Sequence, residues 1–254
     1  MQQHKIFLAI LLLLFLVPDA IAKKKEHPEN NPGGLTNKGR VNLGLAQSYF
    51  DNQDLETALA RANEALRTDP KSADVHAMLG LIYSHIAQND KAAAEFRRAL
   101  ELAPNSGAIL NIDGVWLCQQ GQAAQADAQF IKALQDPFYK QPEQALFNAG
   151  QCALSAGQLP KAELYLRSSL AKAPDQPDVL LSLAQVEFAQ GNFMDARAFI
   201  QRRDSLGSSP QVLELAARIE DGAGDHKAAQ NYRERLRDEF PTSTLPTGEG
   251  AKRP

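Results

Sequence analysis

The sequence predicts an all-α protein, a right-handed superhelical solenoid of six repeats and about twelve antiparallel helices. A 34-residue pattern of small and apolar residues recurs between Gly39 and Pro241. Single glycines recur where the two helices of a repeat would be joined, and no segment alternates apolar and polar residues as a half-buried strand does. Stacked helical repeats bury a continuous core between neighbours, so we expect one domain with a concave face.

The clearest repeat runs from Ala73 to Ser106. Its small and apolar anchor positions, followed by a closing proline, are Leu79, Gly80, Tyr83, Ala92, Phe96, Ala99 and Pro104. This pattern and period are typical of the tetratricopeptide repeat. Gly80 and Ala92 are small where two antiparallel helices approach closely, and Phe96 fills the space beside them. Pro104 cannot continue a helix and ends the second one.

The other repeats follow from the same template, and they are expected at residues 39–72, 107–142, 143–176, 177–208 and 209–241. The third is longer by two residues, through the segment DPFYKQP. The first repeat places Leu45 on the template, and the sixth places Leu215, Ala216, Ala228 and Tyr232. The glycines expected to end the first helices in a left-handed conformation are Gly121, Gly157, Gly191 and Gly224.

The two ends of the chain differ in composition from the array. Residues 1–22 combine a polar head, an apolar run and a small-residue Ala-Ile-Ala site, which predicts a cleaved signal peptide. The run from Ile6 to Val17 is too short for a membrane-spanning helix, which needs about 20 residues. Residues 23–38 are expected to be a flexible linker, and residues 242–254 a disordered tail. Lys23 follows the cleavage site where a lipoprotein would carry cysteine, so no direct lipid anchor is expected.

The sequence offers no candidate catalytic residue, metal ligand set or cofactor motif. Its five histidines have no metal-ligand spacing among themselves or with the two cysteines. A phosphate-binding glycine loop, a nucleophile elbow and a metalloprotease helix are also missing from it. With a net charge of −3, no overall field favours nucleic acid. We therefore expect neither an enzyme nor a binder of small molecules or nucleic acid.

The first helix of each repeat should line the concave face, with its second, fifth, ninth, twelfth and thirteenth residues pointing inwards. The positions that we expect to contact a partner are Arg40, Leu43, Gln47, Phe50, Leu81, His85, Asn111, Val115, Phe147 and Gln151. They are mostly apolar or amide side chains, with Arg40 as the main cation, which favours an apolar peptide or amphipathic helix as ligand. We expect the partner mainly on an apolar strip of Leu43, Phe50 and Leu81 in the first two repeats. The alternative for any one of these residues is that it packs under a neighbouring helix.

Two segments of the third and fourth repeats carry a family resemblance. They read NIDGVWLCQQG from Asn111 and DPFYKQPEQALFNAGQCALSAG from Asp136. They resemble the PilF/PilW family of six-repeat periplasmic pilotins of type IV pili, with its N-N-x-G-x-[FW]-L-C-x-x-G, D-P-x-Y and N-x-G-x-C motifs. Two positions depart from that pattern: Ile112 replaces the second asparagine, and Lys23 stands where many members carry a lipid-bearing cysteine.

The resemblance implies a non-enzymatic periplasmic factor that helps the pilus secretin to assemble in the outer membrane, or that stabilises the fibre. The alternative is a periplasmic adaptor that organises other cell-envelope enzymes. The resemblance also implies a disulfide between Cys118 and Cys152, which an oxidising compartment would favour. Two separate buried thiols that act as small apolar residues are the alternative.

Overall fold

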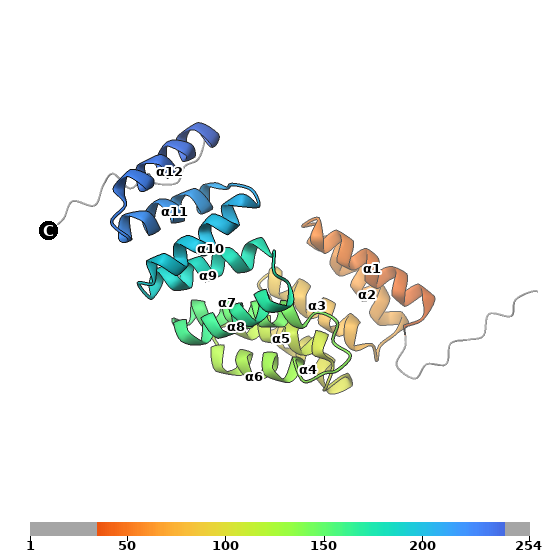
Figure 1. The fold of residues 1–254 in the computed structure, drawn as a ribbon. Helices are drawn as coiled ribbons and strands as arrows, with labels where there is room; N and C mark the ends of the chain where they lie inside the picture. Colours follow the sequence, from red (N-terminus) through yellow and green to blue (C-terminus); the bar gives the residue numbers. More distant parts are fainter. Residues whose placement is uncertain (1–34, 242–254) are drawn as a thin grey trace, which may run out of the picture. The chain divides into compact units, whose positions relative to one another are not determined.

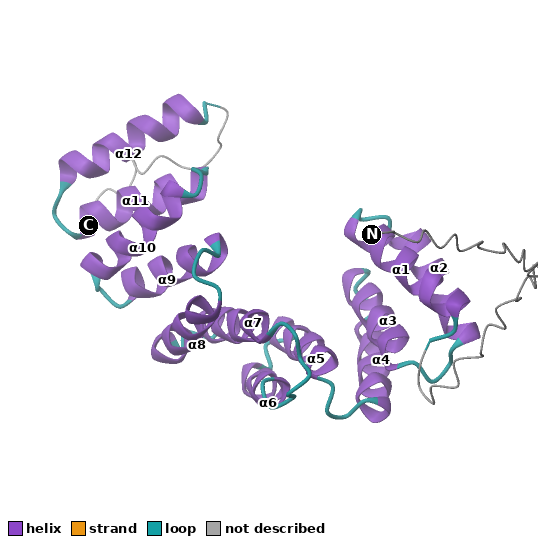
Figure 2. Ribbon diagram, turned by 45° about the vertical axis from the view of Figure 1, so that its right-hand side comes forward, coloured by secondary structure: helices purple, strands orange, loops and turns teal. Residues whose placement is uncertain are grey.

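The computed structural model describes residues 35–241. The predicted signal peptide, most of the predicted linker and the predicted tail lie outside these residues. Within them the chain forms twelve α-helices (Figures 1 and 2). Their bounds are α1 Asn37–Asp51, α2 Leu55–Thr68, α3 Ala73–His85, α4 Asn89–Leu102, α5 Gly107–Gln119, α6 Ala123–Ala133, α7 Pro142–Ser155, α8 Leu159–Lys172, α9 Pro177–Ala189, α10 Phe193–Ser205, α11 Pro210–Gly222 and α12 His226–Glu239. None of these twelve is long and apolar enough to cross a membrane.

The helices pack as six pairs, and the pairs follow one another as the repeat pattern predicts. Within each pair the first helix packs along the second, as α1 does with α2. Each second helix then contacts the first helix of the next pair. Successive odd-numbered helices from α1 to α11 also contact one another, whereas successive even-numbered helices do not. The first helices therefore form a continuous layer.

Helix starts are set by local side chains. The Thr36 hydroxyl accepts a hydrogen bond from the Gly39 amide, so α1 begins at Asn37, inside the segment that was expected as linker. Asp54 caps α2 in the same way. The prolines Pro142, Pro177 and Pro210 occupy first turns, where a missing amide hydrogen costs nothing.

The small anchor residues lie where the helices of a pair approach closely. A Cβ atom on Gly80 would lie 2.7 Å from the Phe96 ring, and one on Gly114 would lie 2.7 Å from the Phe130 ring. Ala92 has no exposed surface. In these two pairs the ring of the second helix therefore packs directly on the backbone of the first helix, where a glycine leaves room for it.

The turns between paired helices need one left-handed residue. In the third to sixth repeats this residue is the predicted glycine, as in Gly121 with a φ of 74°. The first two repeats use Gln53 and Ala87, with φ values of 63° and 57°. The template does not predict these two, because left-handed conformations are uncommon for residues other than glycine.

Two anchor assignments differ from the template. In the first repeat Leu45 is 36% exposed, whereas its equivalent Leu79 packs with Ala46 of the preceding repeat; α1 is the first helix of the described residues 35–241. In the sixth repeat Ala229 is fully buried and Ala228 only half-buried. The predicted register is wrong there by one residue, because Ala229 follows the buried Ala196 by 33 residues and not 32.

The two-residue lengthening of the third repeat forms an anchored loop between α6 and α7. The Asp136 carboxylate accepts hydrogen bonds from the amides of Gly107, at 2.7 Å, and Phe138, at 2.9 Å. These two bonds lower the pKa of Asp136. The Tyr139 side chain packs against Gly107, and burial raises its pKa to about 12. The D-P-x-Y motif thus ties the end of the third repeat to the start of its own first helix.

Candidate functional site

The predicted apolar strip of the first two repeats is formed by α1 and α3. Leu43 and Phe50 are half-buried and pack against the core cluster that contains Ala46 and Leu79. The Phe50 ring meets the His85 ring edge-on, with centroids 4.5 Å apart. Leu81 is half-buried on α3, while His85 is exposed. The structure therefore brings Phe50 and His85 together, and both half-buried leucines keep part of their surface accessible.

Arg40 and Gln47 lie on α1 and are exposed. The Arg40 guanidinium donates to the Asn37 side chain and to the Leu35 carbonyl, each at 3.3 Å. Gln47 donates to Asp51 at 2.8 Å. These hydrogen bonds are local to the start and the end of α1, and they place a polar edge on the helix that carries Leu43 and Phe50.

The predicted residues of the third and fourth repeats join neighbouring first helices. Asn148 on α7 donates to Asn111 on α5 at 3.0 Å, and Gln151 on α7 donates to Ser182 on α9 at 2.9 Å. Val115 and Phe147 are half-buried and pack against the cores of the third and fourth repeats. All four residues therefore contact neighbouring helices, and Val115 and Phe147 are half-buried against a core cluster in the same way as Leu43 and Phe50.

The disulfide lies in the same layer of first helices. Cys118 on α5 is bonded to Cys152 on α7, with their Cα atoms 5.7 Å apart. Both cysteines pack in the core cluster that contains Leu117 and Phe130. The bond therefore links the third repeat to the fourth, as the resemblance implied.

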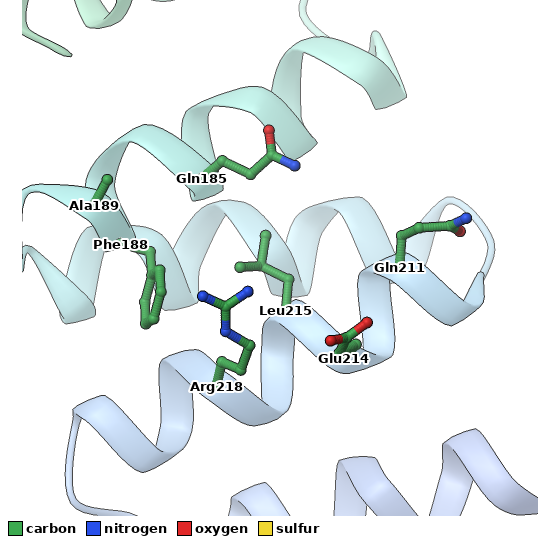
Figure 3. Close-up of a pocket in the computed structure, with 7 residues that line it drawn as sticks. All are labelled: Gln185, Phe188, Ala189, Gln211, Glu214, Leu215 and Arg218. Atoms are coloured by element: carbon green, nitrogen blue, oxygen red, sulfur yellow. The ribbon is translucent and has the colours of Figure 1, made fainter. Parts of the chain in front are cut away.

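A groove between α9 and α11 was not among the predicted sites (Figure 3). Its volume is about 380 Å³, and its lining residues are Gln185, Phe188, Ala189, Gln211, Glu214, Leu215 and Arg218. The Arg218 guanidinium lies over the Phe188 ring, 5.0 Å from its centroid. Gln211, Glu214 and Arg218 are the second, fifth and ninth residues of α11. They lie one residue after the inward positions that counting from the predicted repeat start at Ser209 gives, so the sequence rule misses them. The groove adds Arg218 to Arg40 as a cation of the first-helix layer.

No group of three or more histidine, cysteine, aspartate or glutamate side chains in residues 35–241 is arranged to hold a metal ion.

Comparison with known proteins identifies the type of repeat and the proteins to which this chain is similar. Models described as tetratricopeptide repeat match residues 43–107, 117–177 and 153–219. The type IV pilus assembly protein PilF of Pseudomonas aeruginosa is 27% identical over 239 residues, which cover 91% of this chain and 94% of that protein. Because the matches span nearly the full length of both proteins, the similarity extends beyond individual repeats.

Two solved structures extend this similarity to the fold. The crystal structure of PilW, described as a widely conserved type IV pilus biogenesis factor, is 33% identical in sequence and superimposes with a TM-score of 0.77. That superposition covers 82% of this chain and 96% of PilW. The structure of Pseudomonas aeruginosa PilF is 26% identical, with a TM-score of 0.72, over 81% of this chain and 93% of PilF. With its repeat number, its anchored D-P-x-Y loop and its disulfide, this chain belongs to the PilF/PilW family of tetratricopeptide-repeat proteins.

Proposed function

We propose that this protein is a non-enzymatic assembly factor for type IV pili, and that it promotes assembly of the pilus secretin in the outer membrane by binding it. The observation that carries the proposal is the similarity to PilF and PilW over the whole array, with 33% identity to PilW. The binding surface is the strip of Leu43, Phe50 and Leu81.

The chemistry of the strip supports a protein ligand. Leu43, Phe50 and Leu81 are half-buried, so each is fixed by core packing and still has apolar surface to offer. Aromatic residues held in this way are frequent energetic centres of protein interfaces. His85 and Arg40 lie beside the strip and supply polar groups at its edge. An apolar segment or amphipathic helix of the secretin fits this arrangement.

The disulfide supports an oxidising compartment, because structural disulfides persist outside the cytosol. We therefore place the protein in the periplasm, peripheral to the outer membrane where secretins assemble. The predicted signal peptide gives the route of export.

Removal of the protein tests this function. In a piliated strain that lacks this chain, we expect envelope fractions to contain secretin monomers and few multimers, with recovery when the gene is restored. Secretin multimers at the normal level in the deletion strain would overturn the proposal. A pull-down from envelope extract that returned cell-wall enzymes and no secretin would favour the adaptor alternative.

A further inference from the structure

The groove between α9 and α11 concentrates polar side chains that have no partner. Within residues 35–241, the side chains of Gln185, Gln211 and Glu214 take part in no hydrogen bond or ion pair. The equivalent glutamine of the preceding repeat does have a partner. Gln151, 34 residues before Gln185, donates to Ser182 on α9, the first helix of the next repeat. Side-chain hydrogen bonds therefore join α5 to α7 and α7 to α9, whereas none joins α9 to α11 within residues 35–241.

Arg218 makes the groove electrostatically distinct. Its guanidinium is a cation, and the contact with the Phe188 ring holds it at the wall of the groove. Its N–H groups have no acceptor among the described residues. Glu214, one helical turn earlier on α11, lines the same groove but forms no ion pair with Arg218. The complementary ligand group beside Phe188 is a carboxylate, and a second carboxylate near Glu214 would be repelled.

The floor between these charges is apolar. The floor is formed by Phe188, Ala189 and Leu215. Leu215 is only 7% exposed. A volume of about 380 Å³ lies within the range of ligand-binding pockets. The two glutamines flank this floor, and each amide can donate to and accept from a peptide backbone.

We propose that the α9–α11 groove binds an extended segment of a partner protein in which a single Asp or Glu lies beside an apolar residue. The ligand carboxylate pairs with Arg218, and its apolar side chain rests on Phe188 and Leu215. Gln185 and Gln211 bind the peptide backbone. One guanidinium satisfies a side-chain carboxylate through two parallel hydrogen bonds, whereas sites for a chain terminus usually gather several donors. This site is separate from the strip of the first two repeats and does not depend on which partner that strip binds.

The test uses the full-length mature protein and immobilised nonapeptides that are acetylated and amidated. Each peptide has one central leucine in a glycine and serine background, with glutamate, glutamine or alanine placed one, two or three residues away. We expect a glutamate peptide to bind at least about tenfold more tightly than its glutamine analogue, the usual effect of a hydrogen bond to a charged group. Arg218→Gln should abolish this preference. Arg237→Gln, which removes an exposed charge from α12 outside the groove, should leave it unchanged.

Glu214→Gln gives a second readout, which a purely structural role would not change. This variant should bind peptides with two glutamates several-fold more tightly than the parent protein does, because it removes the repulsion. The proposal fails if no peptide shows a preference for glutamate, or if Arg218→Gln retains it. It also fails if glutamine peptides with a free carboxyl terminus bind best, since the groove would then capture chain ends. A change of molecular mass in light scattering on Arg218→Gln would assign the groove to a second copy of the chain.

Discussion

Cys118 on α5 and Cys152 on α7 are joined across two neighbouring first helices, so one covalent bond links the third repeat to the fourth. In a repeat array each unit contacts only its neighbours, and stability depends on the interfaces between them. The bond closes a loop over a sequence separation of 34 residues at one of these interfaces. Its main effect should be to restrict separation of the two repeats.

Replacing both cysteines by alanine should therefore lower the free energy of unfolding by about 4 kcal/mol, the value that loop-closure entropy gives for a loop of this size. This loss can be measured by urea titration, with unfolding monitored by circular dichroism. The wild-type protein unfolded in a reducing agent is the matched control and should lose a similar amount. Identical urea midpoints for the oxidised protein and the double variant would contradict this role. So would recovery of two free thiols from denatured, unreduced periplasmic protein.

Two glycines provide a paired prediction with opposite signs. Gly80 lies under the Phe96 ring, and a Cβ atom there would come within 2.7 Å of it, so Gly80→Ala should destabilise the protein by about 1–3 kcal/mol. Gly44 lies in α1 with no atom within 4 Å of an added Cβ. Gly44→Ala should stabilise by about 1 kcal/mol, because alanine is the better helix former. An unchanged or higher urea midpoint for Gly80→Ala would contradict the close packing inferred at Gly80, and a lower one for Gly44→Ala would contradict the open space inferred at Gly44.

The sequence predicts the repeat architecture because its signals are local and periodic. Small residues such as Gly80 and Ala92, and turn glycines such as Gly121, recur at fixed spacing, and each has a direct steric reason. The template misses the register of the sixth repeat because Ala229 follows Ala196 by one residue more than the predicted spacing, and helical periodicity alone tolerates such a shift.

The partner site is harder to predict, because exposure and hydrogen bonding depend on the neighbouring repeat. Position counting places Gln151 and Gln185 on the same face, but only the structure shows that Gln151 is bonded to Ser182 while Gln185 is unpaired. Likewise, Arg218 lies one residue after the inward position that counting from Ser209 gives, and its contact with Phe188 depends on how α11 packs beside α9. Such contacts between repeats lie outside what a single-repeat template encodes.

A buried carboxyl in the third repeat gives a pH-dependent prediction. Asp113 on α5 is 4% exposed and accepts one hydrogen bond from Gln129, at 2.7 Å. Burial raises its pKa, and the bond from Gln129 offsets this only in part. A raised pKa means that the folded chain holds this proton more tightly than the unfolded chain does. The stability from this group is therefore fully present below the unfolded pKa of about 3.9, and it is lost as pH rises through the folded value.

Asp113→Asn should remove this dependence, because the asparagine carbonyl still accepts the bond from Gln129 and cannot ionise. We expect the variant to have a higher urea midpoint than the wild type at pH 7, and the difference to shrink as pH falls towards 4. A variant that was less stable than the wild type at pH 7 would show that the ionised carboxylate is favoured in the fold.

The most direct test of the central claim is the level of secretin multimers in cells that carry Phe50→Ala and Leu81→Ala together. These substitutions remove most of the apolar strip of the first two repeats, so we predict loss of the multimers while the purified variant keeps its helical circular-dichroism signal. Leu164→Ala is the matched control, because Leu164 is 64% exposed on α8, which is a second helix, and its removal should leave the multimers intact. A double variant that folds and still supports wild-type levels of secretin multimers would contradict the claim that this strip binds the secretin.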